Sequence, residues 1–116
     1  MDALSKLMEF KFDQKTITFQ GQTFIVKEMN AEDKTNYETG LYEYKQIGKE
    51  LKVTPKMENH KSKLVVHTLH DEQGNKIFKG IEDLPIVNKL PGAFVDLVAS
   101  TATSLNGLDQ EDVSKN

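Results

Sequence analysis

The chain has 116 residues, a length that fits one domain with a modest core. Hydrophobic residues make up 37% and charged residues 28%, which excludes a wholly disordered chain. Cysteine is absent, which excludes disulfides, thiolate nucleophiles and cysteine-based zinc sites. No apolar run reaches the ~18 residues of a membrane span, and the N-terminus lacks a secretory pattern, so we expect a cytoplasmic protein with no membrane partner.

The charge also argues against a nucleic-acid partner. The net charge is −3, and all 15 basic residues are lysine. Arginine is the usual reader of guanine and the usual bidentate clamp on phosphate, and a nucleic-acid groove needs a basic stripe. The lysine-rich stretch over residues 52–63 is weak by that standard and is interpreted as a solvated loop.

The first elements predicted along the chain are a helical turn and a hairpin. Apolar residues within 3–8 suit one short turn of helix. Two β-rich runs, 16–19 and 23–26, flank Gly21, which can take the positive φ of a tight turn, so they predict a β-hairpin. A lone hairpin is marginal in water, so we expect it to pack on a partner element.

A helix is predicted next, over residues 31–51. Asn30 is a suitable N-cap, and the two acidic residues that follow favour the positive end of the helix dipole. Tyr37, Leu41 and Tyr44 recur at steps of four and three, which places them on one helical face. We expect that face to belong to the core.

The C-terminal half predicts two further helices. Residues 82–90 carry apolar residues in helical register, and residues 91–106 form the clearest helix, closed by Gly107 in the left-handed position. Residues 64–70 are short and β-branched, and they fit either a strand or a helix.

Together these elements predict an α+β fold, with an N-terminal β-hairpin packed on a mainly helical domain. The helices lie near residues 31–51, 82–90 and 91–106. We expect residues 1–108 to form a single domain, and residues 109–116 to form a flexible acidic tail.

Signatures of catalysis are missing from the sequence. His60, His67 and His70 share a helical face, but a strand would separate the last two, and a zinc site needs three or four preorganised ligands. There is no G-x-S-x-G elbow and no glycine-rich phosphate loop. Carboxylate pairs fall at predicted caps and turns, which explains them without chemistry. We therefore predict no enzyme, no catalytic residue, no metal and no cofactor.

What the sequence offers instead is apolar surface for contact with other proteins. Tyr42 and Ile47 lie off the predicted core stripe, and tyrosine supplies rigid, amphipathic contact area. The candidate partner-binding residues are Leu4, Leu7, Met8, Tyr42 and Ile47. A chain with such surface and no catalytic group reads as a binding or assembly protein.

One family shows a similar order of features. From Lys63 to Phe78, an apolar run meets an acidic turn, Asp71-Glu72-Gln73-Gly74-Asn75, then a basic residue and an Ile-Phe pair. A short acidic helix, a Leu90-Pro91 step and a helix ending in Leu-Asn-Gly-Leu at 105–108 follow. This order resembles that of small tail assembly chaperones of long-tailed bacteriophages and prophages, over most of the chain and most strongly over 63–108.

The resemblance implies a protein that is not an enzyme, acts in the host cytoplasm and is absent from the mature virion. Its partners would be the tape measure protein, which it keeps soluble, and the tail tube protein, which it helps to recruit. The family also allows self-association. The alternative is a structural tail component, such as a tube or completion protein, that stays in the particle.

Overall fold

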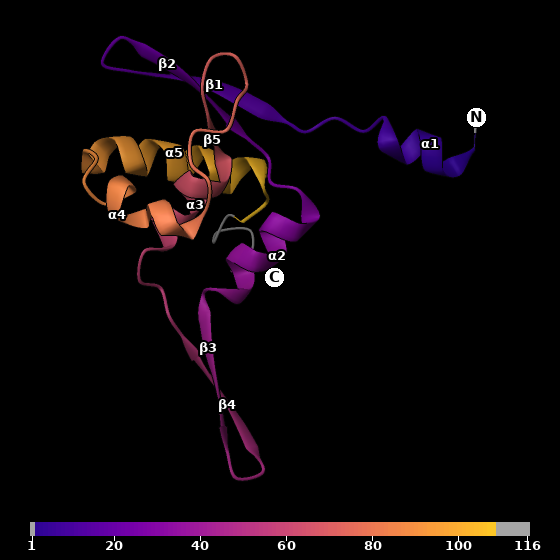
Figure 1. Cartoon of the computed structure of the whole chain (residues 1–116), viewed down its shortest axis with the longest axis vertical. Helices are drawn as coiled ribbons and strands as arrows, with labels where there is room; N and C mark the ends of the chain where they lie inside the picture. Colours follow the sequence, from indigo (N-terminus) through magenta and orange to yellow (C-terminus); the bar gives the residue numbers. More distant parts are fainter. Residues whose placement is uncertain (1, 109–116) are drawn as a thin grey trace.

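The computed structural model describes residues 2–108, and Figure 1 shows a packed body from which two arms extend. In chain order the elements are α1 (Ala3–Met8), β1 (Gln14–Phe19), β2 (Gln22–Lys27), α2 (Ala31–Thr39), β3 (Tyr42–Ile47), β4 (Glu50–Pro55), α3 (His60–Thr68), β5 (Leu69–His70), the 3-10 turn η1 (Ile81–Asp83), α4 (Leu84–Val87) and α5 (Gly92–Leu105). The predicted α+β class is confirmed. The expected acidic tail, residues 109–116, lies outside the described residues.

The predicted N-terminal hairpin is formed by β1 and β2, which belong to a three-stranded sheet in the order β1-β2-β5. Both strand pairs are antiparallel, and Phe19 lies opposite Gln22 at the turn. Gln20 and Gly21 both have positive φ, at 51° and 80°. Two such residues are typical of a type I′ turn, whose twist matches that of the flanking strands.

Helix α5 is the centre of the core and confirms the helix predicted over residues 91–106. Its buried residues are Phe94, Val95, Val98, Ala99 and Ala102. The helix packs against α3 and also against β1 and β2. The ring of Phe94 meets Phe19 and Phe24 edge-on, with centroids 5.2 and 5.5 Å apart, which fixes the hairpin on the helix. Within residues 2–108, no helix has both the length and the apolar character needed to cross a membrane.

Residues 64–70, which fit either a strand or a helix, contain both. Helix α3 runs through Thr68, and the two residues of β5 then pair with β2. Leu64, Val65 and Val66 are all buried, so α3 is covered on several sides. Thr68 is buried as well, and its Oγ1 donates to the Leu64 carbonyl at 2.6 Å, which satisfies the hydroxyl.

The helix predicted over residues 82–90 is shorter and divided. The 3-10 turn η1 leads into α4, which ends at Val87 and buries that residue in the core. Pro85 lies in the first turn of α4, where a missing N–H breaks no helical hydrogen bond.

The helix predicted over residues 31–51 is wrong in its second half. Helix α2 begins as predicted, with Asn30 Oδ1 accepting from the Asp33 N–H at 2.8 Å, but it ends at Thr39. Residues 42–55 form the β3–β4 hairpin instead. Apolar residues in this segment recur at steps of three and four, as in a helix, but they also alternate with polar residues, as in a strand. Gly48, at φ 61°, makes the turn between the two strands.

This correction changes one part of the expected core. Tyr37 is buried, and Leu41 is partly buried against the core, as expected. Tyr44 is 53% exposed, because it lies on β3 rather than on a helix that faces α3. The expectation that Tyr44 belongs to the core is therefore wrong.

Both arms leave the body without burying a side chain in it. No residue of α1, β3 or β4 is buried, and Figure 1 shows α1 and the β3–β4 hairpin pointing away from the packed elements. The radius of gyration is 16.4 Å, against roughly 13 Å for a compact domain of this length. The arms account for the difference, since the body itself is tightly packed.

A buried side-chain amide joins the end of α5 to the segment between β2 and α2. Asn106, at the end of α5, accepts a hydrogen bond from the Met29 N–H at 2.8 Å and donates one to the Ala102 carbonyl at 2.8 Å. It is 5% exposed. Gly107 follows in the left-handed region at φ 65°, as predicted, and turns the chain so that Leu108 packs against the core.

Replacing Asn106 with alanine should lower the free energy of unfolding by about 2 kcal/mol, because the buried Met29 N–H would lose the side-chain acceptor that it has within residues 2–108. Urea denaturation followed by circular dichroism measures this loss. Asn75→Ala is the matched control, since Asn75 is exposed and its change should stay within ~0.5 kcal/mol. Equal losses in the two variants would contradict the proposed importance of the Asn106 contact.

Candidate partner-binding surface

The first arm carries three of the residues predicted to bind partners. Leu4, Leu7 and Met8 are all on α1 and are 67%, 54% and 79% exposed. Asp2 caps the helix through a hydrogen bond from the Ser5 N–H at 2.8 Å, and that bond lowers the pKa of the Asp2 carboxyl. The cap therefore stabilises a short helix that buries none of its own residues.

The second arm, the β3–β4 hairpin, has two chemically different faces. Side chains that lie opposite each other in the register share a face, and the face alternates along each strand. One face, called here the apolar face, carries Tyr42, Tyr44, Gln46, Leu51, Val53 and Pro55. The other, called the polar face, carries Glu43, Lys45, Ile47, Glu50, Lys52 and Thr54. Such alternation is typical of a sheet that buries one side.

The two predicted partner-binding residues of this arm are therefore separated. Tyr42 belongs to the apolar face and is 44% exposed, whereas Ile47 belongs to the polar face and is 54% exposed. Both are at the surface, as a binding role requires. One partner surface that lies flat on the hairpin cannot contact both.

A groove opens at the base of this hairpin, between α2, α3 and α5. Its volume is about 770 Å³. The residues that give it an apolar lining include Leu41, Tyr42, Met57, Leu64, Ala99 and Leu108. Tyr42 belongs both to the groove and to the apolar face of the hairpin, so the two surfaces are continuous.

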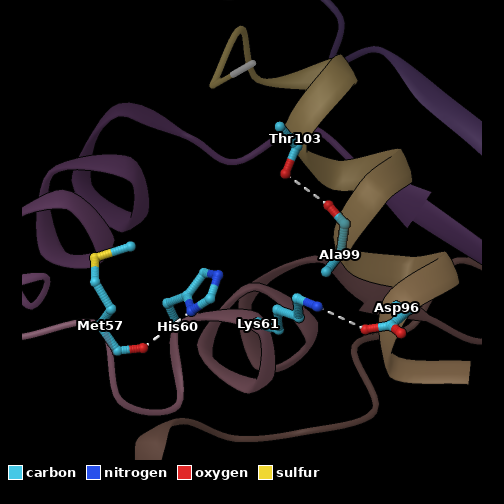
Figure 2. Close-up of polar contacts among 6 residues, drawn as sticks. All are labelled: Met57, His60, Lys61, Asp96, Ala99 and Thr103. Atoms are coloured by element: carbon cyan, nitrogen blue, oxygen red, sulfur yellow. Dashed lines mark hydrogen bonds and ion pairs between the residues drawn. The ribbon is translucent and has the colours of Figure 1, made fainter. Parts of the chain in front are cut away.

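Several polar side chains at the groove make contacts within the chain. Figure 2 shows Lys61 reaching from α3 to Asp96 on α5, and the Nζ–Oδ1 distance is 2.9 Å. His60 Nδ1 lies 2.9 Å from the Met57 carbonyl oxygen. The ion pair is exposed on both sides and contributes little to stability. In a groove with a mostly apolar lining, burial of apolar surface supplies the binding energy, and the polar groups at the rim fix the orientation of the bound molecule.

The three histidines do not come together. His60 contacts Met57, His70 Nδ1 lies 2.8 Å from the Thr68 carbonyl oxygen, and His67 Nδ1 lies 3.9 Å from Asp33 Oδ1. Over residues 2–108, no three side chains of metal-binding type gather in one place. Each histidine therefore makes its own local contact.

His67 is the least satisfied of the three. Its Nδ1 is buried and has no hydrogen-bond partner in the described part of the chain. Burial lowers the pKa of His67, the nearby Asp33 carboxylate raises it, and Lys76 lowers it, with burial the largest cause. The imidazole that packs between α2 and α3 is therefore favoured in its neutral form.

Sequence reasoning missed several exposed apolar residues. Tyr44, Leu51 and Val53 were hidden by the helical interpretation of the second arm, and they are 53%, 61% and 48% exposed. Phe10 and Phe12, which follow α1, are 78% and 58% exposed. The period-two alternation from Tyr42 onward was the signal that would have revealed the first three.

Comparison with known proteins identifies the fold. Neither a protein-family model nor a curated protein sequence matches the chain. The structure is similar to that of the bacteriophage HK97 tail assembly chaperone, with a TM-score of 0.60, and the match covers 88% of this chain and 95% of that one at 16% identity. The chain therefore has the fold of a tail assembly chaperone, and the resemblance drawn from the sequence is confirmed at the level of the fold.

His67 makes the stability of the fold dependent on pH. In the unfolded chain its pKa is about 6.5, so below that pH the unfolded state takes up a proton that the buried imidazole resists. The contribution of neutral His67 to the free energy of unfolding is thus fully present above about pH 6.5. It is lost as the pH falls toward the lowered pKa of His67 in the folded state.

His67→Gln should remove this contribution. The decrease in Tm between pH 7.5 and pH 5.5 should shrink by about 3 °C in the variant, and thermal melts at the two values measure it. Burial also lowers the pKa of His70, so the double variant with His70→Gln should show a still smaller decrease. An unchanged decrease in both variants would contradict the assigned role of burial.

Proposed function

We propose that this protein is a tail assembly chaperone of a long-tailed bacteriophage or prophage. It binds the tape measure protein, keeps that protein soluble and helps to recruit tail tube subunits around it. It acts in the host cytoplasm, catalyses no reaction and leaves before the virion is complete. The observation that carries this proposal is the similarity in fold to the HK97 tail assembly chaperone over 88% of the chain.

The distribution of apolar surface supports a role in binding other proteins. A monomer rarely exposes large contiguous apolar patches unless they serve an interaction. Here two arms carry exposed apolar side chains, and no residue of α1, β3 or β4 is buried. The groove between α2, α3 and α5 adds a third apolar surface next to the second arm.

The exposed residues divide among different partners in this proposal. Tyr42 lies beside the groove and serves the client. Ile47, on the opposite face of the hairpin, and Leu4, Leu7 and Met8, on the other arm, serve contacts with tube subunits or further copies of this chain. The geometry supports a division among partners, because Tyr42 and Ile47 lie on opposite faces of the hairpin and Leu4, Leu7 and Met8 lie on the other arm.

Co-expression with the tape measure protein of the same tail gene cluster tests the first part. The chaperone should move most of that protein from the insoluble to the soluble fraction and should co-purify with it. Replacing Leu4, Leu7 and Met8 together with serine should leave the melting temperature within ~2 °C, since these residues are exposed. It should also leave the client soluble while weakening tube recruitment. A tape measure protein that stays insoluble beside the unaltered chain would refute client binding.

Mass spectrometry of purified virions tests the second part. A chaperone should be absent from intact particles and present in the lysate of infected cells. A tube or completion protein would be found in the particle in stoichiometric amounts, and that outcome would replace the proposed function with the structural one.

A further inference from the structure

The apolar face of the β3–β4 hairpin is left uncovered by residues 2–108. Alternation of apolar and polar side chains is typical of a strand pair with one face buried. Yet Tyr44, Leu51 and Val53 on this face are 53%, 61% and 48% exposed. A two-stranded hairpin by itself is marginal in water, so a second apolar surface would stabilise it. The groove at the base of the hairpin is such a surface, and the two are continuous through Tyr42.

The apolar face is turned toward the side of the hairpin on which the groove opens. Tyr42 belongs to this face and also lines the groove. Side chains of one face leave the strands on the same side, so the next pair outward, Tyr44 and Val53, points to that side too. Lys45 and Lys52 belong to the opposite face and point away from the groove. A bend at the base is therefore enough to lay the inner half of the apolar face over the groove.

The base of the hairpin has the features of a hinge. Gly40 follows α2, and Asn59, at φ 61°, precedes α3, so both connections are element-terminal positions of the kind that absorb changes in φ and ψ. The bond from the Lys56 N–H to the Leu41 carbonyl lies within the base itself and moves with the hairpin. Lys63 donates to the Gly40 carbonyl at 3.1 Å, and its long side chain tolerates a small movement.

The far wall of the groove has small side chains that leave room for larger ones. Ala99, Ser100 and Thr103 of α5 line this wall, and Figure 2 shows Ala99 and Thr103 across the groove from Met57. The Thr103 hydroxyl already donates to the Ala99 carbonyl at 2.7 Å, so covering it leaves no buried donor unpaired. The ring of Tyr44 is therefore matched by space rather than by another large side chain.

Charge favours the apolar face of the hairpin over a charged occupant of the groove. The charged lining residues are Glu38, which is exposed, and the ion pair of Lys61 with Asp96. Both signs are present, so the groove attracts neither a cation nor an anion strongly. The apolar face carries no charged side chain, so closure brings no like charges together and breaks no ion pair.

We propose that the β3–β4 hairpin is a flap that closes over the groove of its own chain. In the closed state Tyr44 and Val53 lie against Ala99 and Ser100, and the apolar face and the groove cover each other. Figure 1 shows the open state, with the hairpin pointing away from the body. A molecule that binds in the groove must first open the flap. The closure is a property of the chain alone and does not rest on the proposed function.

Spin labels measure closure in the protein without any partner. The chain has no cysteine, so Lys49→Cys at the hairpin turn and Ser104→Cys on α5 take labels specifically. Ser104 is exposed and does not line the groove, so its label leaves the closed position free. Double electron–electron resonance should give two populations of distances, the one of the open structure and a shorter one.

Tyr44→Ser combined with Val53→Ser should lower the ratio of the short to the long population by about tenfold, because the closed state loses its apolar contacts. Ile47→Ser is the matched control. It removes a similarly exposed apolar side chain from the polar face of the same hairpin and should leave the ratio unchanged. Circular dichroism confirms that each variant keeps its fold.

Disulfide trapping is an independent test that keeps Tyr44 in place. Val53→Cys with Ser100→Cys should form an intramolecular disulfide under mild oxidation, since the bond needs Cβ atoms about 4 Å apart. Thr54→Cys with Ser100→Cys is the control, because Thr54 is the next residue of β4 but belongs to the polar face. This control pair should form the bond several times more slowly.

Each alternative outcome counts against the flap. A single long distance between the labels would overturn it, and so would a short population that the double variant leaves unchanged. A short population that grows with protein concentration would assign the contact to a second copy and overturn the inference as well. Equal trapping of the Val53 and Thr54 pairs would reduce the contact to random collision. None of these results bears on binding of the tape measure protein, so the proposed function is tested separately.

Discussion

Packing of α5 against both α3 and the β1–β2 hairpin is the contact on which the rest of the structure depends. Phe94 holds the hairpin from one side of α5, and Val98 is fully buried within the core. At the end of the same helix, Asn106 binds the Met29 N–H and so fixes the entry to α2. Without α5, the β1–β2 hairpin would lose the helix on which it packs, and α2 would keep its contact with α3 but lose the Asn106 bond at its entry.

This small core leaves the side chains of the two arms exposed. A chain of this length buries only about two-thirds of its surface. Within residues 2–108, most of the buried hydrophobic residues lie on α3, α5 and β2. The Lys56 N–H to Leu41 carbonyl bond closes the base of the β3–β4 hairpin, and Lys63 of α3 donates to the Gly40 carbonyl just before the hairpin begins. The body therefore serves as the base that presents an apolar surface it does not cover.

Local chemistry made some of these features predictable from sequence and left others ambiguous. Gly21 in a tight turn and Gly107 after a long apolar stripe each allow one interpretation, and both are confirmed. Residues 42–55 satisfy a helical period and a strand period at once, and only the turn at Gly48 decides between them. For the candidate site, the sequence identified Tyr42 as exposed but missed Tyr44 and Leu51, because the face to which they belong exists only in the hairpin.

The exposed β3–β4 hairpin must avoid pairing with the same hairpin of another copy of the chain. Its two edges and its apolar face are open, which is a hazard for aggregation. Lys45 and Lys52 lie directly opposite each other on the polar face, and like charges in that position weaken the pair. They also repel the same face of a second hairpin, since stacked copies would bring four lysines together. Some stability of the isolated arm is thus exchanged for resistance to pairing between copies of the hairpin.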